Sequence, residues 1–136
     1  MKVDPLRVFE TVLYVGDLDA AARFYADVLG LELCDRGDSY LAFRCGQGVL
    51  LLFDATKSAE PGRSVPSHGT VGAGHLAFLA TDDQLESWRG RLEAAGLAIE
   101  AEVEWPAGGR SIYFRDPAGN SLEFAPPSLW GGGWKV

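Results

Sequence analysis

Hydrophobic and polar residues follow the same order twice along this chain. In the first half, an apolar run with β-branched residues predicts a strand at 8–15. Apolar residues at helical spacing from about Asp17 to Leu29 predict a helix that Gly30 ends. Shorter apolar runs separated by glycine-containing turns predict three more strands, at residues 31–34, 40–45 and 49–53.

The second half repeats this order. A strand is predicted at 74–80, and Thr81 with Gln84 forms a capping-box signature for a helix that runs to about Ala95. After Gly96 come the segment GLAIEAEV and the hairpin RSIYFRDPAGNSLEFA, which turns at DPAGN. The segments 11–33 and 76–100 align to within one residue.

The repeat predicts an α+β fold of two tandem βαβββ modules. We place the modules at about 8–54 and 73–126 of a single domain, joined by a linker at 55–72. A linker of that length is expected to be a crossover or a functional lid. Residues 127–136 are expected to form a C-terminal tail that glycines loosen near its end.

Three predicted strands each carry one side chain that could bind a metal. These are Glu10, His75 and Glu123, and the overlay of the two modules gives Glu10 and His75 equivalent positions. Strand side chains alternate between the two faces, so each of the three lies opposite the larger apolar residues of its own strand.

Two interpretations fit that placement. A sheet with one solvated face needs no explanation for a polar residue on it. However, the face that carries these three residues is otherwise largely apolar, which is more typical of a ligand pocket. One imidazole and two carboxylates suit Zn, Ni, Mn, Co or Fe and leave coordination positions open. Convergence of Glu10, His75 and Glu123 would therefore make a divalent-metal site.

The tandem βαβββ repeat, together with LYVGDLDAAARFYADVLGLEL, GHLAF and YFRDPAGNSLEF, resembles the vicinal oxygen chelate superfamily. This superfamily includes glyoxalase I, extradiol dioxygenases, fosfomycin-modifying thiol transferases and bleomycin-binding proteins. The resemblance implies a cupped mixed sheet around a divalent metal whose substrate chelates through adjacent oxygens. It also implies metal and catalytic roles for Glu10, His75 and Glu123, and a homodimer with the site between chains.

The resemblance implies a metal-dependent glyoxalase-like enzyme, of lyase or isomerase type, acting on a small molecule. Where glyoxalase I has a fourth ligand, this chain has Leu51 or Leu52. Two alternatives stay open: an extradiol dioxygenase-like Fe(II) enzyme, and a metal-free binding protein of the bleomycin-resistance type. The pair of carboxylates counts against the first alternative, and the presence of the three ligands counts against the second.

Five further residues are candidates for substrate contact or for a pocket wall. Ser111 and Tyr113 alternate along one strand and so face the same side, where the resemblance to the thiol transferases implies contact with polar substrate oxygens. His68 lies on the linker and could act as a general base near neutral pH. Trp105, like Trp130, is a candidate for a pocket wall.

Charge and hydropathy exclude some classes of partner. The net charge of −7 argues against nucleic acid and anionic membrane surfaces. No apolar stretch approaches the roughly 20 residues of a membrane span. The first residues lack the apolar run of a signal peptide, so we expect a cytoplasmic protein.

Overall fold

The computed structural model describes residues 5–131 and 134 of the chain. The chain forms two compact units, residues 1–71 and 72–136. Each unit contains one four-stranded mixed sheet, with strand order β1-β4-β3-β2 in the first unit and β5-β8-β7-β6 in the second. The predicted α+β class and the tandem βαβββ order are therefore confirmed.

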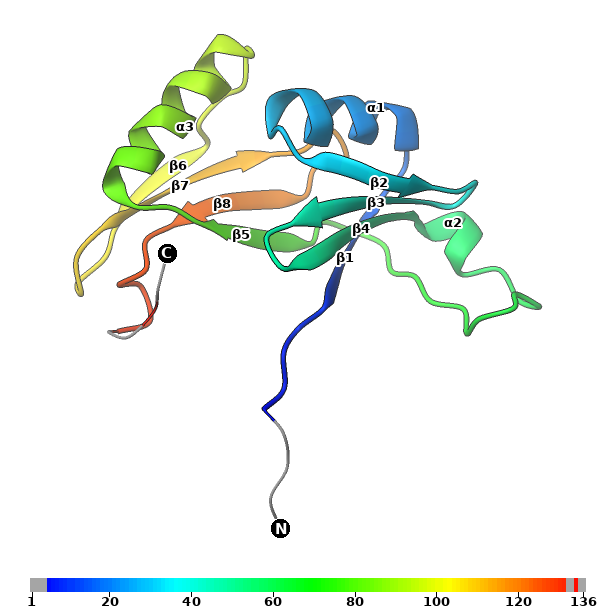
Figure 1. Cartoon of the computed structure of the whole chain (residues 1–136). Helices are drawn as coiled ribbons and strands as arrows, with labels where there is room; N and C mark the ends of the chain where they lie inside the picture. Colours follow the sequence, from blue (N-terminus) through cyan, green and yellow to red (C-terminus); the bar gives the residue numbers. More distant parts are fainter. Residues whose placement is uncertain (1–4, 132–133, 135–136) are drawn as a thin grey trace. The chain divides into compact units, whose positions relative to one another are not determined.

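The first unit follows the predicted order of elements. Its strands are β1 (Glu10–Val15), β2 (Glu32–Arg36), β3 (Tyr40–Cys45) and β4 (Gly48–Asp54). Strand β1 pairs in parallel with β4, and the remaining pairings in the sheet are antiparallel. Helix α1 (Leu18–Arg23) lies against one face of this sheet (Figure 1).

Two features of the first unit differ from the predicted pattern. The predicted helix continues beyond α1 as a π-helical turn, η1 (Phe24–Val28), in which the Leu29 amide donates to the Phe24 carbonyl. The wider turn accompanies burial of two consecutive residues, because Phe24 is 6% and Tyr25 0% exposed. The linker contains a short helix, α2 (Ala55–Ser58), that the sequence pattern did not predict.

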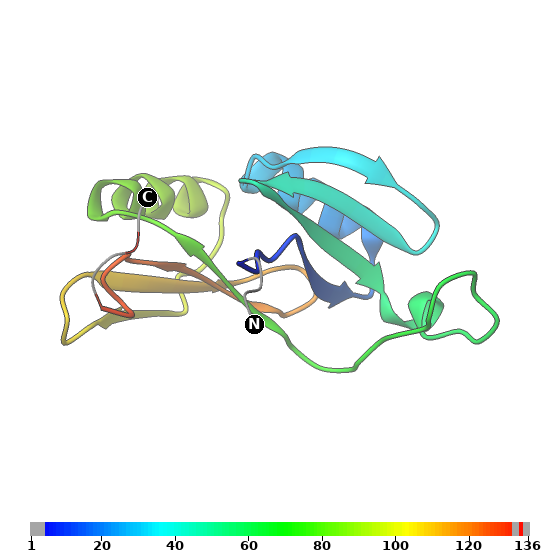
Figure 2. The ribbon, with the colours of Figure 1, turned by 60° about the horizontal axis from the view of Figure 1, so that its bottom comes forward.

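The second unit repeats the same plan. Its strands are β5 (His75–Leu79), β6 (Ala101–Glu104), β7 (Arg110–Arg115) and β8 (Ser121–Ala125). Helix α3 (Asp82–Ala94) covers one face of the sheet, as Figures 1 and 2 show. The predicted capping box is present, since the Thr81 and Gln84 side chains each accept from the other residue's amide.

The core of the second unit lies between α3 and its sheet. Leu85 and Leu92 of α3 are 1% and 0% exposed. The Trp88 ring stacks on Phe124 with the ring centroids 4.7 Å apart. Residues Ile112, Phe114 and Leu122 complete the buried set. Because these side chains alternate along their strands, His75 and Glu123 fall on the face opposite α3, as the strand alternation predicted.

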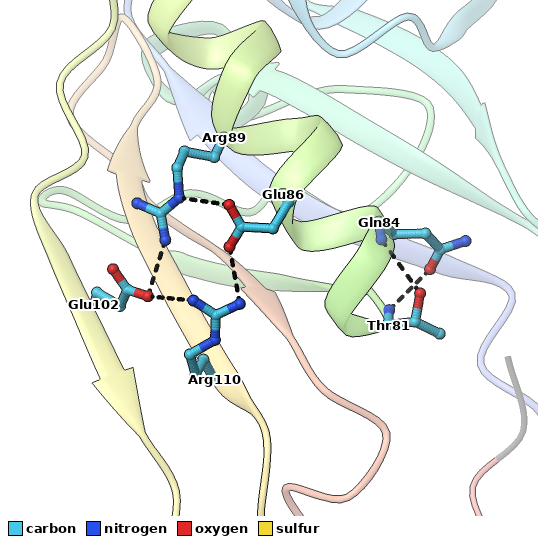
Figure 3. Close-up of polar contacts among 6 residues, drawn as sticks. All are labelled: Thr81, Gln84, Glu86, Arg89, Glu102 and Arg110. Atoms are coloured by element: carbon cyan, nitrogen blue, oxygen red, sulfur yellow. Dashed lines mark hydrogen bonds and ion pairs between the residues drawn. The ribbon is translucent and has the colours of Figure 1, made fainter.

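A closed ring of four charged side chains joins α3 to the neighbouring strands β6 and β7 (Figure 3). Arg89 lies 2.9 Å and Arg110 3.0 Å from the same Glu102 oxygen. Both arginines also contact Glu86, at 3.3 Å and 2.8 Å. The hydrogen bond from Arg110 is the largest cause of the lowered pKa of Glu86. The ring lies on the helix side of the sheet, whereas His75 and Glu123 lie on the opposite face.

No helix among the described residues is both long and apolar enough to cross a membrane.

Candidate metal-binding site

The second unit brings two of the three predicted metal ligands into contact. His75 is the first residue of β5, and Glu123 is the middle residue of the neighbouring strand β8. The His75 Nε2 atom lies 3.2 Å from Glu123 Oε1. The imidazole is half exposed, whereas the Glu123 side chain is only 6% exposed. One accessible and one buried ligand thus share a face of the sheet.

A hydrogen bond to the backbone determines which ring nitrogen of His75 carries a proton. His75 Nδ1 lies 2.9 Å from the Ser121 carbonyl oxygen, which can only accept a hydrogen bond. Nδ1 therefore carries a proton, and Nε2 of the neutral ring is an acceptor that faces a carboxylate oxygen. Two acceptors at this distance repel each other unless a proton or a cation lies with them.

A divalent metal fits this arrangement. Metal-binding histidines commonly donate their second ring N–H to a backbone carbonyl, as His75 does to Ser121. Neighbouring ligands on one ion lie about 3.0–3.4 Å apart when each bond is near ~2.1 Å. Glu123 Oε2 is buried and has no hydrogen-bond partner among the described residues. A buried carboxylate oxygen without a partner is costly, and a bound cation would remove that cost.

A series of neighbouring polar side chains leads from the edge of the sheet to Glu123. The indole Nε1 of Trp105 donates to the Ser111 hydroxyl at 2.8 Å, and Ser111 is fully buried. The Tyr113 hydroxyl lies close enough to Ser111 and Glu123 for both side chains to shift its pKa. Tyr113 lies directly across from Glu123 in the β7–β8 register, and its ring stacks on His75 with the centroids 6.3 Å apart. The predicted common orientation of Ser111 and Tyr113 is confirmed.

The other two predicted residues, Glu10 and His68, belong to the first unit. Glu10 is the exposed first residue of β1. His68 lies on the linker, where its Nδ1 is 2.7 Å from the Tyr14 hydroxyl and its ring meets the edge of Phe53. Among residues 5–131 and 134, no group of three or more His, Cys, Asp or Glu side chains could hold a metal ion. The three-ligand set that includes Glu10 stays a prediction.

The turn between β7 and β8 places the His75–Glu123 pair. Asp116 Oδ1 accepts from the amides of Ala118 and Asn120, and its Oδ2 accepts from the Asn120 side chain. The Asn120 Oδ1 then accepts from the amide of Gly74 at 2.7 Å. Gly74 directly precedes His75, and Asn120 lies three residues before Glu123. The D-P-x-G-N motif was predicted only as a turn, yet its buried side chains also fix the start of β5.

Comparison with known proteins determines the family. A model of the Glyoxalase/Bleomycin resistance protein/Dioxygenase superfamily matches residues 7–124. The chain belongs to this superfamily.

Relatives within the superfamily carry different names. The crystal structure of a lactoylglutathione lyase from Agrobacterium tumefaciens shares 42% sequence identity and a TM-score of 0.89, covering 94% of this chain and 98% of that one. Glutathione transferase FosA of Serratia marcescens is 33% identical over 118 residues, 86% of this chain and 78% of FosA. Lactoylglutathione lyase of Haemophilus influenzae is 30% identical over 127 residues, 88% of this chain and 91% of that protein.

The two sheets of this glyoxalase-superfamily chain differ in what occupies equivalent positions. In the parallel β5–β8 pair, Glu123 lies beside Ala77, two residues after His75. In the parallel β1–β4 pair, Leu51 lies beside Val12, two residues after Glu10. Leu51, rather than Leu52, therefore holds the position equivalent to Glu123. The first sheet therefore has an apolar side chain at the position where the second sheet has a carboxylate.

The pKa of Tyr113 is raised by burial and then by its hydrogen bond with Glu123, so its hydroxyl keeps its proton at neutral pH. Stability from this shift is fully present below the unfolded pKa of about 10 and is lost as pH rises through the folded pKa. We expect wild type to lose more stability above about pH 10 than Tyr113→Phe does. Urea unfolding from pH 8 upward would measure this, and parallel losses in both proteins would contradict it.

Tyr40 needs a matching variant in that experiment. Its pKa is also raised, chiefly by the hydrogen bond that its hydroxyl donates to Asp35. Tyr40→Phe alone and combined with Tyr113→Phe would separate the two contributions.

Proposed function

We propose that this chain is a divalent-metal-dependent enzyme of the lyase or isomerase type. Its substrate would be a small molecule that binds the metal through two adjacent oxygens. The observation that carries the proposal is the pairing of His75 Nε2 with a buried carboxylate whose second oxygen has no partner among the described residues. The names lactoylglutathione lyase and glutathione transferase support small-molecule chemistry with a thiol-containing compound.

His75 and Glu123 would hold the metal, and Glu10 would complete the set. A bound divalent ion supplies Lewis acidity that stabilises negative charge on substrate oxygens. The Tyr113 hydroxyl, kept protonated beside Glu123, lies on the same face of the sheet as the two ligands. Proton transfer from a substrate carbon needs a base, for which Glu10 and His68 are the candidates.

We further propose that the functional protein is a homodimer in which Glu10 of one copy joins His75 and Glu123 of the other. Metal content tests this without a known substrate. Wild type purified without chelators is expected to hold one divalent ion per chain by mass spectrometry, and Glu10→Ala and His75→Ala are each expected to lose it. Glu104→Ala, which removes an exposed strand glutamate of the second unit, is the control.

Mixing the two variants shows where the site lies. If ligands come from different chains, unfolding and refolding Glu10→Ala with His75→Ala together restores about a quarter of the sites, because half the dimers are mixed and each has one intact site. If mixing restores no metal sites, all the ligands of a site come from one chain. If Glu10→Ala binds metal with the affinity of wild type, Glu10 is not a metal ligand. A wild type that binds none of Zn, Ni, Mn, Co or Fe would contradict the enzyme proposal.

A further inference from the structure

A second feature of the same sheet face is an apolar hollow of about 240 Å³ in the second unit. All of the described residues that line it are apolar. One wall comes from β5 and β8, and the other from the segment after β8. The principal lining residues are Ala77, Leu79, Ala125, Pro126, Trp130 and Trp134. An aromatic ring fits within this volume, since an engineered cavity of about 150 Å³ binds benzene.

The hollow begins one side-chain step from the proposed metal ligands. Ala77 follows His75 by two residues on β5, and Ala125 follows Glu123 by two residues on β8. Residues two apart on a strand share a face and lie about 6.5–7 Å apart. A small molecule held at His75 and Glu123 could therefore reach the hollow with a short arm.

The C-terminal wall is fixed by hydrogen bonds and close packing. The Leu129 amide donates to the Pro126 carbonyl, and the Ser128 hydroxyl donates to the Gly108 carbonyl at 2.8 Å. Gly109 has a φ of +82°, and a Cβ there would lie 2.6 Å from Pro126. The part of the tail next to β8 is thus held against the β6–β7 turn. Residues 132–133 and 135–136 lie outside the described residues.

Large apolar side chains around this hollow remain exposed. Trp130 is 81% and Leu79 47% exposed. Exposed apolar residues gathered around a preformed concavity are typical of a ligand site. The described residues that line the hollow carry no charge, so an ionic group there would lose its hydration without gaining a partner from them.

We propose that this hollow is a subsite for an apolar group, aromatic or branched alkyl, of the molecule whose oxygens bind at His75 and Glu123. The inference rests on the proposed function for the position of the oxygens. It narrows the substrate class to amphipathic molecules, with an oxygen pair at one end and an apolar group about 7 Å away along the strand direction. The C-terminal segment determines this specificity.

Two hydroxamic acids test the subsite, because each presents the same two adjacent oxygens. Acetohydroxamate has no arm, and 4-phenylbutanohydroxamate carries a phenyl group that can reach the hollow. On metal-loaded wild type the phenyl compound is expected to bind about 10- to 100-fold more tightly by calorimetry. Leu79→Gln and Trp130→Ala are each expected to reduce that ratio to about 3 or less.

Leu33→Gln is the matched control, since Leu33 is 40% exposed on β2 of the first unit and should keep the full ratio. A wild-type ratio near one would overturn the subsite, as would an unchanged ratio in both pocket variants.

A probe without a chelating group separates this inference from the proposed function. The fluorine NMR signal of 2-[4-(trifluoromethyl)phenyl]ethanol is expected to broaden with metal-free wild type and Leu33→Gln, and much less with Leu79→Gln. If neither hydroxamate binds but this difference is seen, the chelation proposal fails and the subsite stands. Equal broadening with all three proteins overturns the subsite, whatever the hydroxamates do.

Discussion

Replacing Glu123 with Gln is expected to weaken divalent-metal binding by more than about 100-fold, because loss of an outer partner alone costs 10- to 100-fold. The same change should leave the metal-free protein about 1 kcal/mol more stable. Glu123 is 4% exposed, and its Oε1 lies 3.2 Å from His75 Nε2, which has a lone pair when the ring is neutral. A glutamine of the same shape can donate to that nitrogen, so an acceptor–acceptor contact becomes a hydrogen bond.

Urea unfolding with and without metal measures both effects. A ligand at 100 times its dissociation constant stabilises the folded state by about 2.7 kcal/mol, and we expect this gain in wild type but not in Glu123→Gln. Glu104→Gln, the same substitution at an exposed position of β6, should behave as wild type. A metal-dependent gain of wild-type size in Glu123→Gln would show that the ion binds elsewhere. A less stable metal-free variant would show that the carboxylate serves the fold.

Most of the fold could be predicted because the chain repeats one pattern. The alternation of side chains along the strands predicts that His75 and Glu123 lie opposite the larger apolar residues, and the observed β5–β8 register agrees with this. A slip of one residue in that register would turn the core side chains toward the other face. The start of β1 was less predictable. Val8 and Phe9 continue the apolar run, yet they are 77% and 62% exposed and precede the first paired residue, Glu10.

The candidate site could be predicted only in part. Residue type and the alternation of side chains along each strand indicated Glu123 and His75 as candidate ligands. Their contact, however, depends on which strands are neighbours in the sheet. The contact of Trp105 with Ser111 requires the turn between β6 and β7, and the position of Tyr113 across from Glu123 requires the β7–β8 register. Local sequence patterns do not determine such pairings. Of the residues that line the apolar hollow, Trp130 was a predicted candidate for a pocket wall, but the hollow itself was not predicted, because it depends on the packing of the C-terminal segment against Gly109.

Asn120→Ala is the second large effect that we expect, a loss of about 2–5 kcal/mol of unfolding free energy. Asn120 is 1% and Asp116 4% exposed. Removing the amide takes away the acceptor of the Gly74 N–H and one donor to the buried Asp116 carboxylate. Each buried polar group left unpaired costs about 1–3 kcal/mol, a large share of the 5–15 kcal/mol typical of a domain.

Asn120→Ala should also affect metal binding, because the lost hydrogen bonds lie next to a proposed ligand. Gly74 directly precedes His75, so a loosened start of β5 should weaken metal binding as well as folding. Urea unfolding and metal titration of the folded fraction measure the two losses, with Gln47→Ala, in an exposed turn, as the control. Unfolding free energy within about 0.5 kcal/mol of wild type would contradict the structural role.

Asn120→Asp separates the two hydrogen bonds of this side chain. Aspartate keeps an acceptor for the Gly74 amide but places a second carboxylate against Asp116, where wild type has a donor. We expect this variant to be destabilised at neutral pH and to recover part of the loss in mild acid, when one proton can be shared between the two carboxylates. Asn120→Ala has no such proton to share and should show no recovery. Equal recovery in both variants would mean that the contact with Asp116 is not what holds the turn to β5.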